Sequence, residues 1–185
     1  MCSVAFGKNE PYRFGFCITG LFFLLMLFIP NIYWGAKAKP AGYDEASKKE
    51  NKVLLIFERG GEVLVTCALV VFPALNPYVK ALPEGLFFDY RLIIWIAAFV
   101  LMIFYECYWI KYFKGERTLR AQYSSFTGFP LAGATLPVIA VFLLGLYSLN
   151  LVVIISAVIL GIGHIGIHFM HYKEARTSLI SDSCS

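Results

Sequence analysis

The chain has 185 residues, of which 59% are hydrophobic, 17% aromatic and 15% charged, and its formal net charge is +4. Because an ordinary soluble domain is roughly 45–50% apolar, this composition, with a mean hydropathy of +0.69, excludes a water-soluble globular domain. Nucleic acid is excluded as a partner, since nothing outside the apolar runs resembles a recognition helix or a platform for stacking bases.

The apolar runs predict an all-α fold, a polytopic membrane helical bundle of about five transmembrane helices forming a single integral membrane domain over residues 1–185. A hydrocarbon core of roughly 30 Å needs about 20 apolar residues per helix, so the chain has room for five spans. The runs are continuous, whereas the strands of a transmembrane barrel alternate apolar and polar residues. We expect the spans at residues of about 14–34, 53–79, 91–111, 131–147 and 151–172.

The first apolar run is expected to be a retained helix. It is long, and it leads into Tyr33 and Trp34 instead of the small residues of a signal-peptide cleavage site. A lysine-rich stretch, residues 35–52, follows it. The five cysteines of the chain are scattered singly, so they predict no disulfide framework.

Three charged residues interrupt the second apolar run, namely Glu58, Arg59 and Glu62. Charged groups at membrane depth are costly and usually face the bundle interior or a wet cavity. Arg59 is predicted to form an ion pair with one or both acids. Either this pair only stabilises the helix packing, or at least one of the acids lines a cavity. Between the acids, Gly60 and Gly61 predict either close helix packing or room for a substrate.

The third apolar run contains one internal acid, Glu106, among aromatic residues that we predict to form an interfacial belt: Tyr105, Tyr108, Trp109 and Tyr112. Only residues 148–150 separate the fourth and fifth runs, which predicts an antiparallel pair of helices. In the fifth run, glycines at 161, 163 and 166 predict tight packing against a neighbouring helix.

Positive charges predict the orientation. The first loop, the third loop and the tail together carry eleven lysines and arginines, whereas the N-terminal segment (including Lys8) and the second loop carry four. Because positive loops stay in the cytoplasm, we expect the N-terminus outside and the C-terminus in the cytoplasm. The basic rim either reflects topology alone or binds the headgroups of membrane lipids, and the residues predicted to bind headgroups are Arg59, Lys114, Arg117 and Arg120.

The three histidines of the chain lie in the last apolar run, at His164, His168 and His171, where spacings of four and three place them on one helical face. Histidines at i and i+4 are typical of helices that bind zinc. His171 lies near the helix end, so we expect it to reach into the interface with Tyr172 and Lys173.

The HxxxH pair is similar to the histidine pair of adiponectin-receptor and ceramidase-type membrane hydrolases, which have a further histidine and seven helices that this chain lacks. ERGGE, residues 58–62, is faintly similar to the motif of glutamate-dependent prenyl-protein proteases, but it is not their paired-glutamate motif. The chain is assigned to neither family.

Heights along the helices predict that these polar residues share a site. At about 1.5 Å of rise per residue, Glu58, Glu106 and His168 each lie roughly 8–9 Å from the cytoplasmic ends of their helices. Glu62 and His164 lie deeper, at roughly 13–15 Å. Three helices would thus bring acids and imidazoles to matching heights.

The main hypothesis is a metal-dependent membrane enzyme acting on a lipid or another amphipathic substrate. A divalent ion, expected to be zinc, would be held by His164, His168 and one carboxylate from Glu58, Glu62 or Glu106, and a remaining acid would be the general base. One alternative is a small proton-coupled transporter, which would need a homo-oligomer to enclose a pathway. The other is a non-catalytic membrane subunit.

Overall fold

The computed structural model describes residues 10–77, 80–82, 85–87 and 90–183, so Lys8 lies outside the described residues. Apart from one short antiparallel hairpin, these residues form helices and their connections. The elements are α1 (Ile18–Tyr33), η1 (Trp34–Ala38), α2 (Tyr43–Ser47), α3 (Lys52–Val71), η2 (Pro73–Leu75), β1 (Lys80–Leu82), β2 (Gly85–Phe87), α4 (Leu92–Lys114), α5 (Leu119–Gln122), α6 (Ala132–Ser148) and α7 (Leu151–Ser183).

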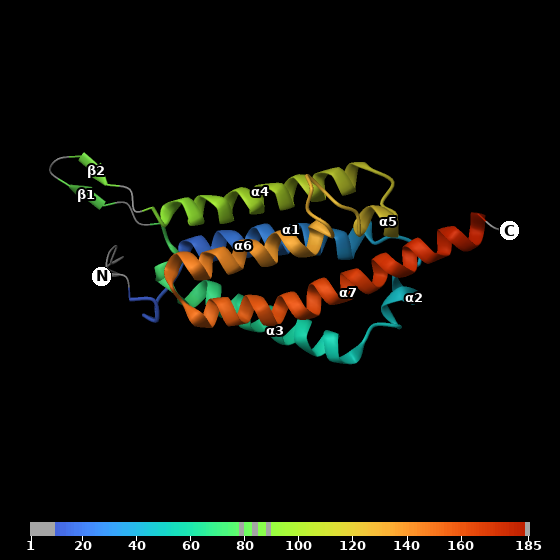
Figure 1. Cartoon of the computed structure of the whole chain (residues 1–185), viewed down its shortest axis with the longest axis horizontal. Helices are drawn as coiled ribbons and strands as arrows, with labels where there is room; N and C mark the ends of the chain where they lie inside the picture. Colours follow the sequence, from blue (N-terminus) through green and yellow to red (C-terminus); the bar gives the residue numbers. More distant parts are fainter. Residues whose placement is uncertain (1–9, 78–79, 83–84, 88–89, 184–185) are drawn as a thin grey trace.

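The long helices run side by side in an elongated bundle (Figure 1). Helix α7 packs along α3 and α6, and α6 in turn packs along α4, so α4 and α3 lie on opposite sides of the bundle. Helix α1 contacts α3 and α4. The short helices α2 and α5 lie at one end, beside the C-terminal part of α7, and the hairpin lies at the other end.

Among the described residues, three helical segments are long and apolar enough to cross a membrane: Ile18–Ala38, Leu92–Lys114 and Leu151–Thr177. Helix α6 is apolar but has only 17 residues. Helix α3 has 20 residues, but the three charged residues near its middle set it apart from the apolar segments. The chain is therefore a helical membrane protein with three clear candidate spans.

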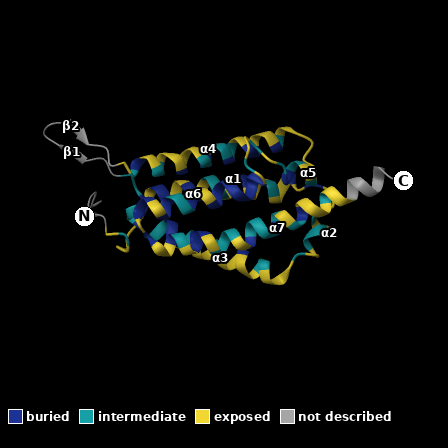
Figure 2. Ribbon diagram, in the orientation of Figure 1, coloured by how far each residue is buried: buried dark blue, intermediate teal, exposed yellow. Residues whose placement is uncertain are grey.

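The surface of the bundle fits that conclusion. Figure 2 shows exposed residues along the outer faces of the long helices and buried residues where the helices meet. Many of the exposed side chains are large and apolar, and those on α1, α4 and α7 include Phe22, Ile32, Ile93, Ile103 and Ile155. An apolar surface this extensive is unfavourable in water and suited to lipid.

Two of the predicted spans differ in extent from the helices that the structure shows. The second helix ends at Val71 instead of continuing to residue 79, because the Phe72–Pro73 bond leads into the short helix η2. The last helix continues to Ser183, well past the predicted end at residue 172.

The predicted aromatic belt on α4 is also wrong. Its four aromatic residues are between 1% and 5% exposed and belong to the bundle core: Tyr105, Tyr108, Trp109 and Tyr112. The tyrosine hydroxyl groups hold other segments, since Tyr105 accepts a hydrogen bond from Asn31 at 2.8 Å and Tyr112 donates one to the carbonyl of Ala38 at 2.9 Å. This face of α4 is therefore inside the bundle.

Candidate functional site

Helices α3 and α7 cross at glycine residues. A Cβ atom added to Gly61 would lie 2.4 Å from the Cα atom of Leu160, and one added to Gly163 would lie 2.1 Å from the backbone nitrogen of Glu58. The two backbones are thus in direct contact, as small residues allow in membrane bundles. The prediction of tight packing is confirmed at Gly61 and Gly163, whereas Gly60 has open space beside it.

This close crossing brings Glu58 to His164. One carboxylate oxygen of Glu58 lies 2.6 Å from Nδ1 of His164, and Glu58 is only 8% exposed. A carboxylate can only accept, so Nδ1 of His164 is the donor and the proton-accepting position of the neutral ring is Nε2. A carboxylate that orients an imidazole in this way is the arrangement of a general base.

One turn further along α7, His168 continues the row. Its ring centroid lies 4.5 Å from that of His164, and the ring meets Tyr123 edge-on at 5.1 Å. The Nδ1 atom of His168 is buried and has no hydrogen-bond partner among the residues that the structure describes. A buried polar atom without a partner is uncommon and marks a place where a proton or a ligand can be received.

The third histidine of the row, His171, is buried as well. It is 4% exposed, and its Nε2 atom lies 2.9 Å from a carboxylate oxygen of Glu50. Tyr123 stacks on its ring at 5.2 Å, and Tyr43 approaches it at 6.1 Å. The expectation that His171 reaches into the interface is wrong, because the loop before α3 supplies it with a buried carboxylate.

We call Glu50, Glu58, His164, His168 and His171 the His–Glu cluster. It runs along one face of α7 with a carboxylate at each end. The two tyrosines that border it are neutral at physiological pH: burial, aided by the carboxylates of Glu50 and Glu58, raises the pKa of Tyr43 to about 12. Burial likewise raises the pKa of Tyr123 above its usual value.

Two of the predicted catalytic acids are not part of the cluster. Glu62 forms an ion pair at 2.9 Å with Arg59; the Arg59 side chain is exposed and that of Glu62 is half-buried. Glu106 belongs to α4, on the far side of the bundle from α3 (Figure 1). One of its oxygens is buried and has no hydrogen-bond partner among the described residues, the histidines included.

The four predicted headgroup residues also occupy different places. The Arg59 guanidinium is held by Glu62, and Nε of Arg117 donates to the carbonyl of Phe113 at 3.1 Å. Lys114 is exposed at the end of α4. Arg120 on α5 lines a cleft at the end of the bundle where the His–Glu cluster lies.

The zinc hypothesis meets a geometric obstacle. In the described part of the chain, no group of three or more histidine, cysteine, aspartate or glutamate side chains is placed to hold a metal ion. Glu58, a predicted ligand, is instead hydrogen-bonded to Nδ1 of His164. The residues present therefore do not by themselves fit a three-ligand catalytic zinc site.

The sequence prediction missed Glu50, Tyr43 and Tyr123. All three lie in polar connections, and no local pattern links such residues to a helix more than 40 positions away. The sequence held a weak signal for Glu50. This residue lies near the predicted cytoplasmic end of the second span, and His171 lies near the predicted cytoplasmic end of the last span, so the two were expected at similar heights.

No family model, curated protein or solved structure matches the chain.

Proposed function

We propose that the chain is a multi-pass membrane enzyme that uses the His–Glu cluster for acid–base chemistry on a lipid or another amphipathic substrate. The observation that carries this proposal is the 2.6 Å contact between the Glu58 carboxylate and Nδ1 of His164, made between two helices that meet through glycines. Because the two backbones are in direct contact, the Glu58–His164 pair is already held in one arrangement and needs no further ordering during the reaction.

In this proposal His164 accepts a proton from the substrate at Nε2, and Glu58 stabilises the imidazolium that results. His168, in ring contact with His164, lies between this pair and the pair formed by His171 and Glu50. The protonated ring can return its proton to the product, or pass it along the row through a bridging water, because no hydrogen bond joins the described rings directly. General acid–base catalysis of this kind contributes roughly 10²–10⁴-fold to a rate.

The proposal includes a finer topology. We propose that α3 and α6 cross the membrane together with the three clear spans, since α3 packs along α7 and its outer face carries exposed apolar residues such as Ile56 and Val63. The excess of lysine and arginine in the first loop, the third loop and the tail supports an N-terminus outside and a C-terminus in the cytoplasm. The His–Glu cluster would then lie in the cytoplasmic half of the bundle.

A proton-coupled carrier is the second candidate, and the row of rings favours it. Three imidazoles follow one another between two carboxylates, which is an arrangement that can relay protons along α7. The same residues serve both candidates, so the two differ in whether a substrate is changed or only moved.

The test uses the purified protein in vesicles of phosphatidylethanolamine, phosphatidylglycerol and phosphatidic acid, with mass spectrometry of the lipids and an internal pH-sensitive dye as readouts. We expect lipid turnover that falls at least 100-fold in Glu58→Gln and His164→Gln. Glu62→Gln is the matched control, because it removes an acid from the same helix that pairs with Arg59 and not with the cluster. Proton flux without any altered lipid would favour the carrier. Turnover that both cluster variants retain would refute the proposal.

A further inference from the structure

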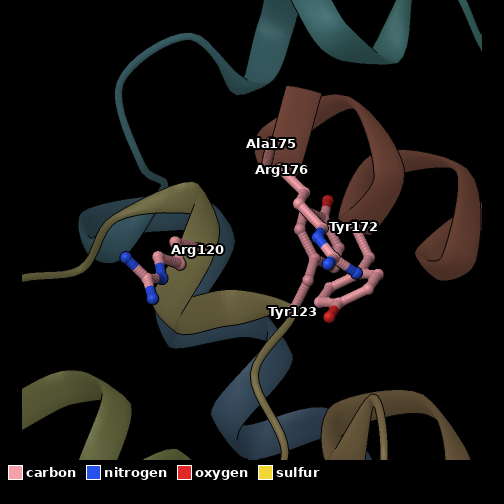
Figure 3. Close-up of a pocket in the computed structure, with 5 residues that line it drawn as sticks. All are labelled: Arg120, Tyr123, Tyr172, Ala175 and Arg176. Atoms are coloured by element: carbon pink, nitrogen blue, oxygen red, sulfur yellow. The ribbon is translucent and has the colours of Figure 1, made fainter. Parts of the chain in front are cut away.

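A cleft opens beside the His–Glu cluster, at the end of the bundle where α5 meets α7. It has a volume of about 150 Å³ and is lined by Arg120 and Tyr123 from the α5 region and by Tyr172, Ala175 and Arg176 from α7. Figure 3 shows Arg176 on the same side of the cleft as Tyr123 and Tyr172, with Arg120 apart from them on α5. The space is large enough for a phosphate group but too small for a whole lipid.

The charge of the cleft is uncompensated. Neither the Arg120 nor the Arg176 guanidinium forms an ion pair or a hydrogen bond with any residue that the structure describes, and both side chains are exposed. None of the acids whose side chains the structure describes lines the cleft. Glu174, the acid closest in sequence to Arg176, has a carboxylate oxygen 3.7 Å from Nδ1 of His171. Two unpaired guanidinium groups that line one cleft are suited to an anion, and the planar fork of arginine matches the geometry of a phosphate group.

The position of the cleft indicates how the phosphate is presented. Tyr172, Ala175 and Arg176 belong to the last turns of the candidate span Leu151–Thr177. At that height a tyrosine and an arginine lie at the level of lipid headgroups, where basic pockets between helices bind anionic lipids. A phosphate carried by a lipid reaches the cleft without leaving the membrane.

We propose that this cleft binds the phosphate of an anionic lipid headgroup, held by Arg120 and Arg176. The inference rests on the proposed function and specifies its substrate class. Tyr123 connects the cleft to the cluster, because its ring lines the cleft and also contacts His168 and His171. A lipid held by its phosphate here has its head beside the histidine row. The same chemistry would accept a soluble phosphate, which the experiment separates.

Binding is measured on the detergent-solubilised full chain by native mass spectrometry, with phosphatidic acid, phosphatidylglycerol and phosphatidylcholine offered in turn and with inorganic phosphate as competitor. We expect both anionic lipids to bind, phosphatidic acid at least tenfold more tightly than phosphatidylcholine. The double variant Arg120→Gln/Arg176→Gln should reduce this preference at least tenfold. The matched control, Lys114→Gln/Arg117→Gln, removes the same charge from the neighbouring loop and should change it less than twofold.

Arg176→Lys and Arg120→Lys keep the charge and lose the planar guanidinium, so each should retain part of the preference. Equal losses in the cleft variant and the loop control would overturn the proposal, as would equal binding of the anionic lipids and phosphatidylcholine. Full displacement by inorganic phosphate at submillimolar concentration would support the phosphate site and assign it a soluble ligand. His164→Gln should bind lipid normally, so a failure of turnover or flux is distinguishable from a failure of binding.

Discussion

Replacing Gly163 by alanine tests the packing on which the site depends. The added Cβ atom would lie 2.1 Å from the backbone nitrogen of Glu58 and 2.6 Å from its Cα atom. Carbon contacts need about 3.5 Å, so α3 and α7 must move apart by roughly 1.4 Å. The hydrogen bond between Glu58 and His164, now 2.6 Å long, would then stretch to about 4 Å and be lost, since such bonds fail beyond about 3.5 Å.

Gly60→Ala is the matched control, because a Cβ atom at Gly60 meets nothing within 4 Å. Both substitutions gain the same helix propensity, about 1 kcal/mol. The difference between the two variants therefore isolates the clash, which we expect to cost about 1–3 kcal/mol in the free energy of unfolding. Equilibrium unfolding in mixed micelles measures this difference. Equal stabilities of Gly163→Ala and Gly60→Ala, with lipid turnover intact in both, would refute the reasoning.

Three further predictions concern Tyr43, the exposed cysteines and the metal. The Tyr43 phenol should titrate near pH 12 in the folded chain, as measured by the absorbance difference from Tyr43→Phe, and Glu50→Gln should lower this pKa. Because the folded pKa is raised above the unfolded value of 10.0, the stability that the neutral phenol contributes is fully present below pH 10 and is lost as the pH rises towards 12. Cys67 on α3 and Cys107 on α4 are exposed on the bundle surface, so in vesicles of variants in which one of them is the sole cysteine, an impermeant maleimide should label the thiol only after detergent has removed the lipid. Labelling of Cys67 before detergent is added would contradict a membrane-spanning α3. Elemental mass spectrometry of the purified chain should find no stoichiometric zinc. Stoichiometric zinc that is lost in His164→Ala would favour the metal enzyme over acid–base chemistry by the chain alone.

Local sequence patterns predicted the helices and part of the site. The four-residue spacing of His164 and His168 correctly placed their rings together, because the helical period is fixed by backbone geometry. The heights brought Glu58 to the right stretch of the last helix but to the wrong ring, since they matched it with His168 and the structure pairs it with His164. The glycines that allow the α3–α7 contact were also readable, since few other residues let two backbones approach so closely.

Height alone could not identify which helices are neighbours. Glu106 was predicted to share the depth of Glu58 and His168, but α4 packs on α6 and α1, so the acid lies away from α3 and α7. Glu50 and Tyr123 were missed for the opposite reason: the loops that carry them are positioned by tertiary contacts with His171, which no local period encodes. The mistaken aromatic belt has a related cause, because tyrosine suits both a wet interface and a core in which its hydroxyl finds a partner.

The most direct measurement is nitrogen NMR of the histidine rings in the selectively labelled protein at neutral pH. Nδ1 of His164 faces Glu58, whereas Nε2 of His171 faces Glu50. We therefore predict opposite neutral tautomers, with the proton on Nδ1 in His164 and on Nε2 in His171. Glu58→Gln should change the signals of His164 and leave those of His171 in place. A proton on Nε2 in both rings, unaffected by Glu58→Gln, would contradict an oriented His–Glu pair and with it the proposed proton-transfer site.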